Sequence, residues 1–438
     1  MLPGANGGLL YQVFSNELEN LFKGEIQTES PEKEAQKQFN AAQKIFNLFA
    51  RDMTASVNPP DIIKKHLEET GGKIVTRFPP EPNGFLHLGH AKAMRFSFNT
   101  ARIYNGVCYL RYDDTNPLTE SMEFINSIEE NVRWLGYEPS KVTHASDYFQ
   151  QLFDFAVELI KKGKAYICNQ PQEEMQEFRK NKKPSPSRDR SPEESLDIFY
   201  RMKAGEFPEG SYCLRLKIDY ASENPTLRDP VAFRIKYHPH PQTGEKWIIF
   251  PTYDFTHGIS DSLENITHSL CSLEFEIRRD LYYWILESLN IYRPMVWEFS
   301  RLNITKTVLS KRKLAKLVKM GIVRGWDDPR LLTINGMRRR GFTPSGINSF
   351  CDEISVTRRG NETMTSIQLL EHCIRKDLDA NSPRTMAVLS PLKVVITNVE
   401  EGFEKELEVY PFPKDKSREK PYKIALTKEV FIESSDFR

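Results

Sequence analysis

Two histidines, His87 and His90, stand in the segment Arg77–His90, which reads RFPPEPNGFLHLGH. They are three residues apart, so in the first turn of a helix both imidazoles share a face and can donate hydrogen bonds to one phosphate group. Gly89 between them lets a flat ring pack directly on the main chain. Two hydrogen-bond donors at one point can stabilise a phosphate whose oxygens gain negative charge during a reaction. The alternative is that both histidines only cap the start of the helix.

A second basic segment reads VLSKRK over Val308–Lys313 and supplies Lys311 and Lys313 at the start of a predicted helix. Taken alone, such a segment is usually a solvent-exposed helix face, because Lys and Arg are seldom buried.

A pair of acidic residues, Asp113 and Asp114, follows a predicted strand over 107–112. A carboxylate there can pair with a cation, and strand ends are where a doubly wound sheet binds ligands. The alternative is a turn cap before Asn116 and Pro117.

The elements around these residues follow a strand, helix, strand pattern, which predicts a parallel sheet. Ligands of such a sheet bind beyond the carboxyl ends of the strands, where helix N-termini offer N–H groups to phosphate. Ser146 is predicted to cap a later amphipathic helix that ends near Gly163. The first strand, the first helix and the second strand are predicted over 73–78, 88–104 and 107–112.

Changes in sequence pattern divide the chain into six regions. The run 180–194, rich in Lys, Arg, Pro and Ser, cannot build a core and is expected to be a disordered surface loop. The regions are an appended helical segment at 1–70, two halves of an α/β pattern at 71–168 and 241–320, an insertion at 169–240, helices at 321–385 and strands at 386–438.

Composition places the chain among ordinary globular proteins, since 39% of its 438 residues are apolar and 28% are charged. Six scattered cysteines without CxxC spacing predict neither a zinc site nor a disulfide framework, and we expect no metal ligated by the protein. No apolar stretch is long enough to cross a membrane, which favours a soluble protein of the cytoplasm. A formal net charge of +1 means that any nucleic-acid surface is a local patch.

The histidine and lysine segments together resemble the paired signatures of class I aminoacyl-tRNA synthetases, His-Ile-Gly-His and Lys-Met-Ser-Lys-Ser. Leu88 takes the isoleucine position, and Leu309-Ser-Lys-Arg is the variant typical of the glutaminyl-tRNA synthetase branch. The resemblance runs in order from about Gly71 to the C-terminus, and the first 70 or so residues look like the tail of the N-terminal domain of eukaryotic members. It is carried by the 78–90 loop, YDDTNP (112–117), YDFTH (253–257), ITHSLC (266–271), FSRLN (299–303), GWDDPR (325–330) and RRRGF (338–342).

The resemblance implies an α/β fold, a doubly wound, Rossmann-like parallel sheet that forms the catalytic domain in two halves. Residues 169–240 would be an inserted α+β domain for the tRNA acceptor stem, 321–385 a helical subdomain, and 386–438 the start of an anticodon-binding β-barrel. We therefore expect these 438 residues to be part of a longer chain. Expressed alone, they should bind ATP and an acceptor-stem duplex but discriminate poorly among anticodons.

The resemblance also assigns site residues. His87, His90 and Lys311 would be catalytic. The amino acid would meet Asp113 through its ammonium group and Tyr253 through its side chain, with Arg77, His257 and Cys271 close by. The ATP site would be lined by Glu81, Pro82, Asn83, His87, Leu88, Gly89, His90, Ala91, Lys92, Ala93, Ser272, Arg301, Leu302, Leu309, Ser310 and Lys311.

Cys271 favours glutamine over glutamate as the amino acid. Discriminating glutamyl-tRNA synthetases resemble this sequence except for an arginine where Cys271 stands. Burying an unpaired carboxylate costs several kcal/mol, more than the roughly 4 kcal/mol of a thousandfold preference. Arg77 is a nearby cation that weakens this argument.

The resemblance implies a ligase that uses ATP with Mg²⁺ to form glutaminyl-adenylate and transfers glutamine to the terminal adenosine of glutamine tRNA. Members of this branch need tRNA before they activate glutamine. The partners would be L-glutamine, ATP and tRNA but no membrane, with a multi-synthetase complex, joined through the N-terminal segment, left open. The alternatives are a glutamyl-tRNA synthetase, a non-catalytic tRNA-binding relative, and an adenylyltransferase that acts on small molecules.

Overall fold

The computed structural model describes residues 54–354, 356, 358 and 364–437. The helical segment expected over 1–70 lies outside the described residues as far as residue 53. Its described end is a 3-10 turn, Thr54–Ser56, and helix α3 (Pro60–Thr70), which stops at Gly71 in the left-handed conformation.

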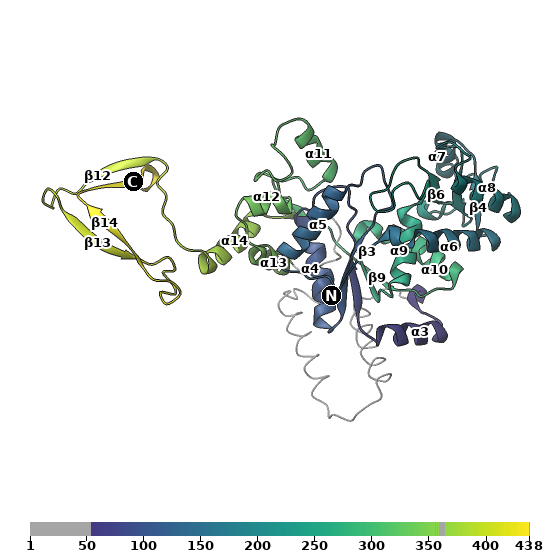
Figure 1. Ribbon diagram of the computed structural model, residues 1–438, viewed down its shortest axis with the longest axis horizontal. Coiled ribbons are helices and arrows are strands. Elements are labelled where there is room, and N and C mark those ends of the chain that lie inside the picture. Colours follow the sequence, from purple (N-terminus) through teal and green to yellow (C-terminus); the bar gives the residue numbers. More distant parts are fainter. Residues whose placement is uncertain (1–53, 355, 357, 359–363, 438) are drawn as a thin grey trace, which may run out of the picture.

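Five parallel strands form the centre of the molecule in two groups (Figure 1). The backbone N–H of Thr267 donates to Val75 O at 2.9 Å, which joins the start of β8 to β1. The order is therefore β3-β2-β1-β8-β9, and the expected doubly wound parallel sheet is confirmed, with its switch point between β1 and β8. The strands are β1 (Val75–Phe78), β2 (Val107–Tyr112), β3 (Lys141–His144), β8 (His268–Ser272) and β9 (Met295–Phe299).

Helices pack in two large hydrophobic cores, of which the first covers the parallel sheet and the second lies on the inserted antiparallel strands. In the first core, α4 (Leu88–Ile103) and α5 (Met122–Trp134) pack with β1 and β2. Helices α13 (Pro344–Glu353) and α14 (Ile367–Asn381) close the same core from the C-terminal side. In the second core, four helices pack together with the inserted strands: α6 (Phe149–Lys161), α8 (Pro192–Ala204), α9 (Tyr253–Leu263) and α10 (Arg279–Leu289).

The prediction that Ser146 caps α6 is wrong. A 3-10 turn, Ala145–Tyr148, precedes the helix, and the capping position belongs to Tyr148. The backbone N–H and the hydroxyl of Ser146 instead donate to the two carboxylate oxygens of Asp114, at 2.9 and 2.7 Å. A buried carboxylate from another strand end has taken the donors that a local cap would have used.

An antiparallel sheet of four strands, ordered β4-β5-β6-β7, interrupts the parallel sheet. It begins at β4 (Ala165–Cys168) and ends at β7 (Ile249–Pro251), so it extends on both sides of the expected 169–240 region. Its other elements are α7 (Gln172–Lys180), α8 (Pro192–Ala204), β5 (Cys213–Leu216), a 3-10 turn at Pro225–Leu227 and β6 (Val231–Ile235).

The expected disorder of the charged run 180–194 is wrong, because its polar side chains are held by the inserted sheet. Arg188 Nε donates to the buried Asp229 carboxylate at 2.8 Å, and Arg190 donates to Ile167 O at 2.9 Å. Ser187 is buried as well. A composition rich in Lys, Arg, Pro and Ser can be ordered where its cations meet buried acceptors.

Beyond the sheet, the chain continues through β10 (Asn303–Ile304), α11 (Lys311–Lys319), α12 (Ile334–Arg339) and β11 (Met364–Thr365). Among the residues described here, no helix has the length and apolar character needed to cross a bilayer.

The last strands, drawn in yellow in Figure 1, lie apart from the rest at the end of an extended segment after α14. They form two antiparallel pairs, β12 with β15 and β13 with β14, and no closed barrel occurs within the described part of this region. Strands were expected there, whereas the start of a barrel remains a prediction. Their bounds are β12 (Pro391–Val395), β13 (Glu404–Val409), β14 (Tyr422–Thr427) and β15 (Glu429–Glu433), before a last 3-10 turn at Ser434–Asp436.

Gly106, between α4 and β2, offers a test of this packing. A Cβ there would lie 2.0 Å from Ile74 O, a carbonyl that already accepts from Val107 N–H and cannot easily move. Gly106→Ala is expected to lower the free energy of unfolding by about 1–3 kcal/mol. Urea unfolding followed by tryptophan fluorescence measures it. Gly71→Asn, in open space at a left-handed position that Asn tolerates, is the control and should cost less than about 1 kcal/mol.

Candidate active site

His87 and His90 stand at the first turn of α4, at the carboxyl end of β1. His87 is the N-cap residue, and its Nδ1 accepts from Gly89 N–H at 3.1 Å. His90 Nδ1 accepts from the backbone N–H of His87 at 3.0 Å, and the two rings lie 3.9 Å apart. The capping alternative is therefore correct as a description of the contacts.

The same caps also fix the tautomer of each ring. Burial and the charge of Lys311 lower the pKa of His87 to about 3, and burial with the neighbouring His87 holds the pKa of His90 well below its usual value. Both rings are therefore neutral near pH 7. Because each Nδ1 is an acceptor, each Nε2 carries the proton and is a donor. The caps fix two neutral N–H donors beside each other.

The loop before the histidines is held by distant parts of the chain. Leu88 N–H donates to Leu332 O at 3.0 Å, and Ile334 N–H donates to Leu86 O at 2.8 Å. These bonds form a short bridge between the loop and the segment before α12. The loop is therefore fixed by tertiary contacts rather than by its prolines alone.

Lys311 reaches this loop from the start of α11. Its Nζ donates to Asn83 Oδ1 at 2.6 Å, and Asn83 in turn donates to the Glu81 carboxylate at 2.6 Å. The stem of Lys311 passes Gly84, where a Cβ would lie 3.5 Å from it. Burial lowers the pKa of Lys311. The two segments singled out in the sequence are thus brought together.

The remaining residues predicted to line the ATP site differ in their surroundings. Ser272 and Arg301 both donate to the Glu274 carboxylate, at 3.0 and 2.6 Å. Lys92 is buried and donates to Ser300 O at 3.0 Å. Ser310 is the N-cap residue of α11. Pro82 is buried in the loop, Leu88, Ala91 and Leu302 lie in the first hydrophobic core, and Ala93 and Leu309 pack against it.

Asp113, directly after β2, has one carboxylate oxygen engaged and one free. Its Oδ1 accepts from Arg111 Nε at 3.2 Å, whereas Oδ2 has no hydrogen-bond partner among the described residues. Burial raises the pKa of Asp113 to about 7, against the pull of Arg111. A buried, unpartnered carboxylate oxygen at a strand end is suited to receive a cation.

A second cluster lies beside Asp113 at the switch point. The Arg77 NH2 group lies 2.7 Å from His257 Nε2 and 3.4 Å from Cys271 Sγ, and the Tyr253 ring stacks on His257 with centroids 5.2 Å apart. Burial lowers the pKa of His257 to about 3, so this imidazole is neutral. The predicted amino-acid residues Arg77, Asp113, Tyr253, His257 and Cys271 therefore occupy one region of the structure.

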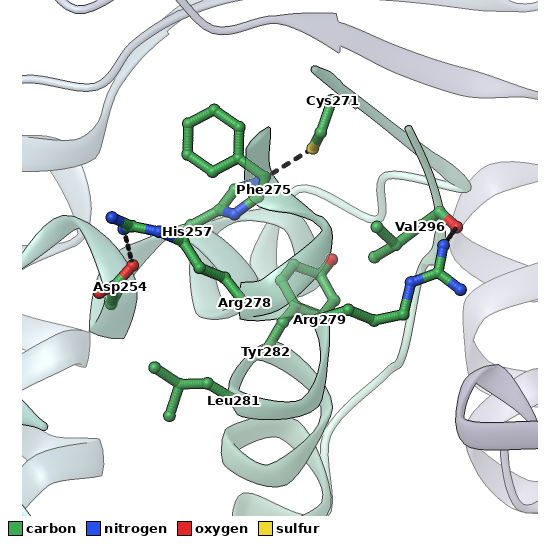
Figure 2. Close-up of a pocket in the computed structure, with 9 residues that line it drawn as sticks. All are labelled: Asp254, His257, Cys271, Phe275, Arg278, Arg279, Leu281, Tyr282 and Val296. Atoms are coloured by element: carbon green, nitrogen blue, oxygen red, sulfur yellow. Dashed lines mark hydrogen bonds and ion pairs between the residues drawn. The ribbon is translucent and has the colours of Figure 1, made fainter. Parts of the chain in front are cut away.

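Figure 2 shows a small pocket to which Cys271 and His257 both contribute. A cavity of about 20 Å³, room for about one water molecule, lies there. Asp254 and Arg278 form an ion pair on one side of it, and Arg279 donates to Val296 O on the other. Its lining is Asp254, His257, Cys271, Phe275, Arg278, Arg279, Leu281, Tyr282 and Val296.

Sequence reasoning missed Arg111 and Asp261, which stand at the centre of this cluster. Asp261 follows His257 by four residues on α9, and both side chains are buried. Arg111 precedes Asp113 by two residues, so both face the same side of β2. Each is a charged residue at a position that the periodicity of its helix or strand places on the buried face. That combination was the sequence signal that could have revealed them.

The neighbouring Asp114 belongs to a different group. Its backbone carbonyl accepts from His240 Nε2 at 2.8 Å, and that nitrogen lies 3.7 Å from Glu120 Oε2. Asp114 thus ties the parallel sheet to the connection between β6 and β7 of the inserted sheet. Burial raises the pKa of Asp114 and of Glu120 to about 8 each.

Family models match most of the chain. One described as "tRNA synthetases class I (E and Q), catalytic domain" matches residues 73–380, and one described as the anti-codon binding domain of the same synthetases matches residues 382–438.

Curated relatives are similar over most of this chain. A cytoplasmic glutamine–tRNA ligase of Arabidopsis thaliana is 54% identical over 87% of the chain and 48% of its own length. A probable glutamine–tRNA ligase of Dictyostelium discoideum is 53% identical over 87% of the chain and 49% of its own length. The chain thus spans about half the length of these relatives. The solved glutamate tRNA ligase of Elizabethkingia meningosepticum is 20% identical, with a TM-score of 0.51 over 70% of each chain, which shows a shared fold.

The raised carboxyl pKa values predict how stability depends on pH. Between about pH 4 and 8 the folded protein holds protons on Asp113, Asp114 and Glu120 that the unfolded chain releases. The free energy of unfolding should therefore fall as the pH rises through this window. Glu120→Gln should make that fall shallower, by up to about 1.4 kcal/mol per pH unit.

Urea unfolding at pH 5, 6, 7 and 8 measures this slope. Glu123→Gln, an exposed residue in the first turn of α5, is the matched control and should leave the slope unchanged. Identical slopes for Glu120→Gln and the wild type would contradict the assignment of a proton to Glu120.

Proposed function

The chain belongs to the class I tRNA synthetases of the E and Q group, and from this we propose that it activates L-glutamine with ATP and transfers it to glutamine tRNA. One observation carries the proposal. The two class I segments are in contact through Lys311 and Asn83, beside a proposed amino-acid pocket that contains Asp113 and Cys271. The protein would be a ligase that forms aminoacyl-tRNA.

In the first step, a carboxylate oxygen of glutamine attacks the α-phosphorus of ATP in line and the bond to the departing pyrophosphate breaks. The Nε2 donors of His87 and His90 would stabilise the charge that develops on the α-phosphate oxygens. The Lys311 ammonium would meet the departing phosphates. No side chain becomes covalently attached, so catalysis would rest on positioning and charge stabilisation.

In the second step, a ribose hydroxyl of the terminal adenosine attacks the carbonyl carbon of the adenylate and AMP leaves. The Asp113 Oδ2, which the protein leaves unpartnered among the described residues, would hold the α-ammonium group through both steps. This orientation would keep the carbonyl carbon in line with the incoming hydroxyl.

Mg²⁺ would enter with ATP and neutralise charge on its phosphates. Within the described ranges, no group of three or more His, Cys, Asp or Glu side chains is arranged to hold a metal ion. The phosphates and water would therefore supply most of the ligands of that ion.

Glutamate is the second candidate amino acid, and the position of Arg77 favours it, because a buried guanidinium lies 3.4 Å from Cys271 Sγ. Against it, Cys271 and His257 present neutral atoms to the pocket. The 50–54% identity to glutamine–tRNA ligases supports the glutamine assignment.

The tRNA would contact several parts of the chain. The inserted region, taken as 169–240, would bind the acceptor stem, and residues 386–438 would take part in anticodon binding, in keeping with the family model over 382–438. The cytoplasm is the proposed location, since the Arabidopsis relative is named as cytoplasmic. A multi-synthetase complex reached through residues 1–70 is a further proposal, and most of that segment lies outside the described residues.

Glutamine-dependent ATP–pyrophosphate exchange, with and without glutamine tRNA, tests the function directly. Exchange that requires the tRNA is expected. Binding of tRNA without exchange under either condition would favour the non-catalytic relative, and exchange with glutamate alone would favour the glutamyl enzyme. Exchange that depends on neither amino acid would point to an adenylyltransferase that acts on another small molecule.

Replacing both His87 and His90 by alanine is expected to raise the barrier to adenylate formation by about 3–6 kcal/mol, because two charge-stabilising donors are lost. The variant should also lose about 1–2 kcal/mol of stability, since both residues cap α4. Single-turnover adenylate formation and thermal unfolding measure the two effects separately.

The matched control is His87→Asn with His90→Gln, because Asn caps well and Gln can complete a capping box. It should unfold at close to the wild-type temperature and remain slow in adenylation. Near-normal rates in this well-folded variant would show that the loop has no catalytic role.

Cys271→Arg is expected to shift use from glutamine toward glutamate, by about tenfold or more in the ratio of kcat/KM, because it supplies a cation to the pocket. Arg77 lies 3.4 Å from the sulfur, so two guanidiniums would compete for the space and the overall activity should fall. Aminoacylation with each amino acid measures the ratio. A ratio that stays at the wild-type value would remove Cys271 from the pocket.

A further inference from the structure

Arg77 poses a problem for the proposed preference for glutamine. Its guanidinium is fully buried beside Cys271 and His257, where the side chain of the amino acid is expected. A free guanidinium at that place would bind a γ-carboxylate in a strong, bidentate manner. Selection of an amide therefore requires that this cation be occupied or neutralised.

Asp261 provides the opposite charge from α9. Its Oδ1 lies 2.9 Å from Arg77 Nε and 2.8 Å from the Arg111 NH2 group. All three side chains are completely buried. Burial would raise the pKa of Asp261, but the two guanidiniums outweigh it and hold the pKa far below its usual value. Asp261, paired with two guanidiniums, is therefore ionised near pH 7.

The remaining donors of Arg77 are also engaged. Its NH1 group donates to Leu270 O at 2.8 Å, and its NH2 group donates to Ser269 Oγ at 2.8 Å. The Ser269 hydroxyl then donates to Asp261 Oδ2 at 2.7 Å. A ring of hydrogen bonds through Asp261 thus fixes the plane of the guanidinium and leaves little capacity for a new acceptor.

The charges in this part of the described chain cancel. The two guanidiniums of Arg77 and Arg111 face the carboxylates of Asp261 and Glu264, with Arg111 NH1 3.0 Å from Glu264 Oε2. Asp113 adds a further carboxyl group, and His257 adds no positive charge near pH 7. A γ-carboxylate placed here would meet a region that is neutral or negative.

We propose that Asp261 is a specificity-determining positioning residue, which neutralises Arg77 and holds it against Ser269 so that the pocket beside Cys271 accepts a neutral amide and disfavours a carboxylate. Asp261 touches no substrate and acts through Arg77. The inference rests on the proposed function, because it concerns the amino-acid pocket of that reaction.

Asp261→Asn is the direct test, since it keeps the shape and an acceptor oxygen but removes the charge. The ratio of glutamate to glutamine use in kcat/KM is expected to rise at least tenfold, mainly through a lower KM for glutamate. The same shift is expected in equilibrium binding of non-hydrolysable sulfamoyl analogues of the two aminoacyl adenylates. Binding needs no turnover, so a chain that fails to charge tRNA still reports on the pocket.

Tyr282→Phe is the matched control, because the Tyr282 hydroxyl donates to Asp261 Oδ2 at 3.1 Å and its loss leaves the charge in place. Both ratios should stay within threefold of the wild type. Equal shifts in the two variants would show that Asp261 acts only as packing, and unchanged ratios in a folded Asp261→Asn protein would overturn the proposal.

Asp261→Asn leaves two guanidiniums less well paired and can lower stability, so the change is repeated in an Arg77→Gln background, where one buried cation is absent. There Asp261→Asn should leave the glutamate to glutamine ratio within threefold of that of Arg77→Gln alone, because the cation through which Asp261 acts is gone. A tenfold rise in this background would show that Asp261 acts on the pocket without Arg77 and would overturn the proposal. Wild-type protein that binds neither adenylate analogue would refute the proposed function itself, a result separate from any change in the ratio.

Discussion

The buried contact between Arg77 on β1 and Asp261 on α9 holds the two halves of the parallel sheet together at the point where ligands would bind. The two residues are 184 positions apart, and the antiparallel inserted sheet lies between them in the sequence. A buried ion pair offsets its desolvation cost only where the remaining hydrogen bonds are satisfied. Leu270, Ser269 and Tyr282 supply those bonds, so the pair depends on β8 and α10 being in place.

The switch point of the sheet therefore determines which side chains lie beside one another. Because β8 lies beside β1, Cys271 and Asp113 emerge at the same edge, and Arg77 and Arg111 lie beneath them. Local strand order sets the positions of the pocket residues, and the buried charges decide how that pocket responds to a charged or neutral side chain. The positions of the pocket residues depend on strand order, and the response of the pocket to charge depends on buried ion pairs. The same residues contribute to both.

Adjacent residues in this site differ in what their side chains contact. The carboxylate of Asp114 accepts from Ser146 and its carbonyl accepts from His240 in the connection between β6 and β7, whereas one oxygen of Asp113 has no partner among the described residues. In the same way, each histidine of the first turn of α4 uses Nδ1 for a helix cap and keeps its proton on Nε2. Structural contacts and the proposed chemical roles are divided between atoms of one side chain or between adjacent side chains, so mutations at these positions are expected to change stability as well as the proposed chemistry.

The sequence by itself determined the features that depend on neighbours in the chain. The pattern around Arg77–His90 predicted the strand, the loop and the helix start, the position after β2 predicted a functional Asp113, and the paired class I segments predicted the family. Periodicity and turn chemistry are local, so these predictions needed no tertiary contact.

Only the tertiary structure decided the partners of the buried charges. Asp261 was not identified from the sequence, Ser146 gave its donors to Asp114 rather than to a helix cap, and the run 180–194 is ordered because its arginines meet the inserted sheet. Each of these outcomes depends on which polar groups are buried together, and burial joins residues that lie far apart in the chain. A buried charge pairs with the group that packing places beside it, and the local sequence does not show which group that is.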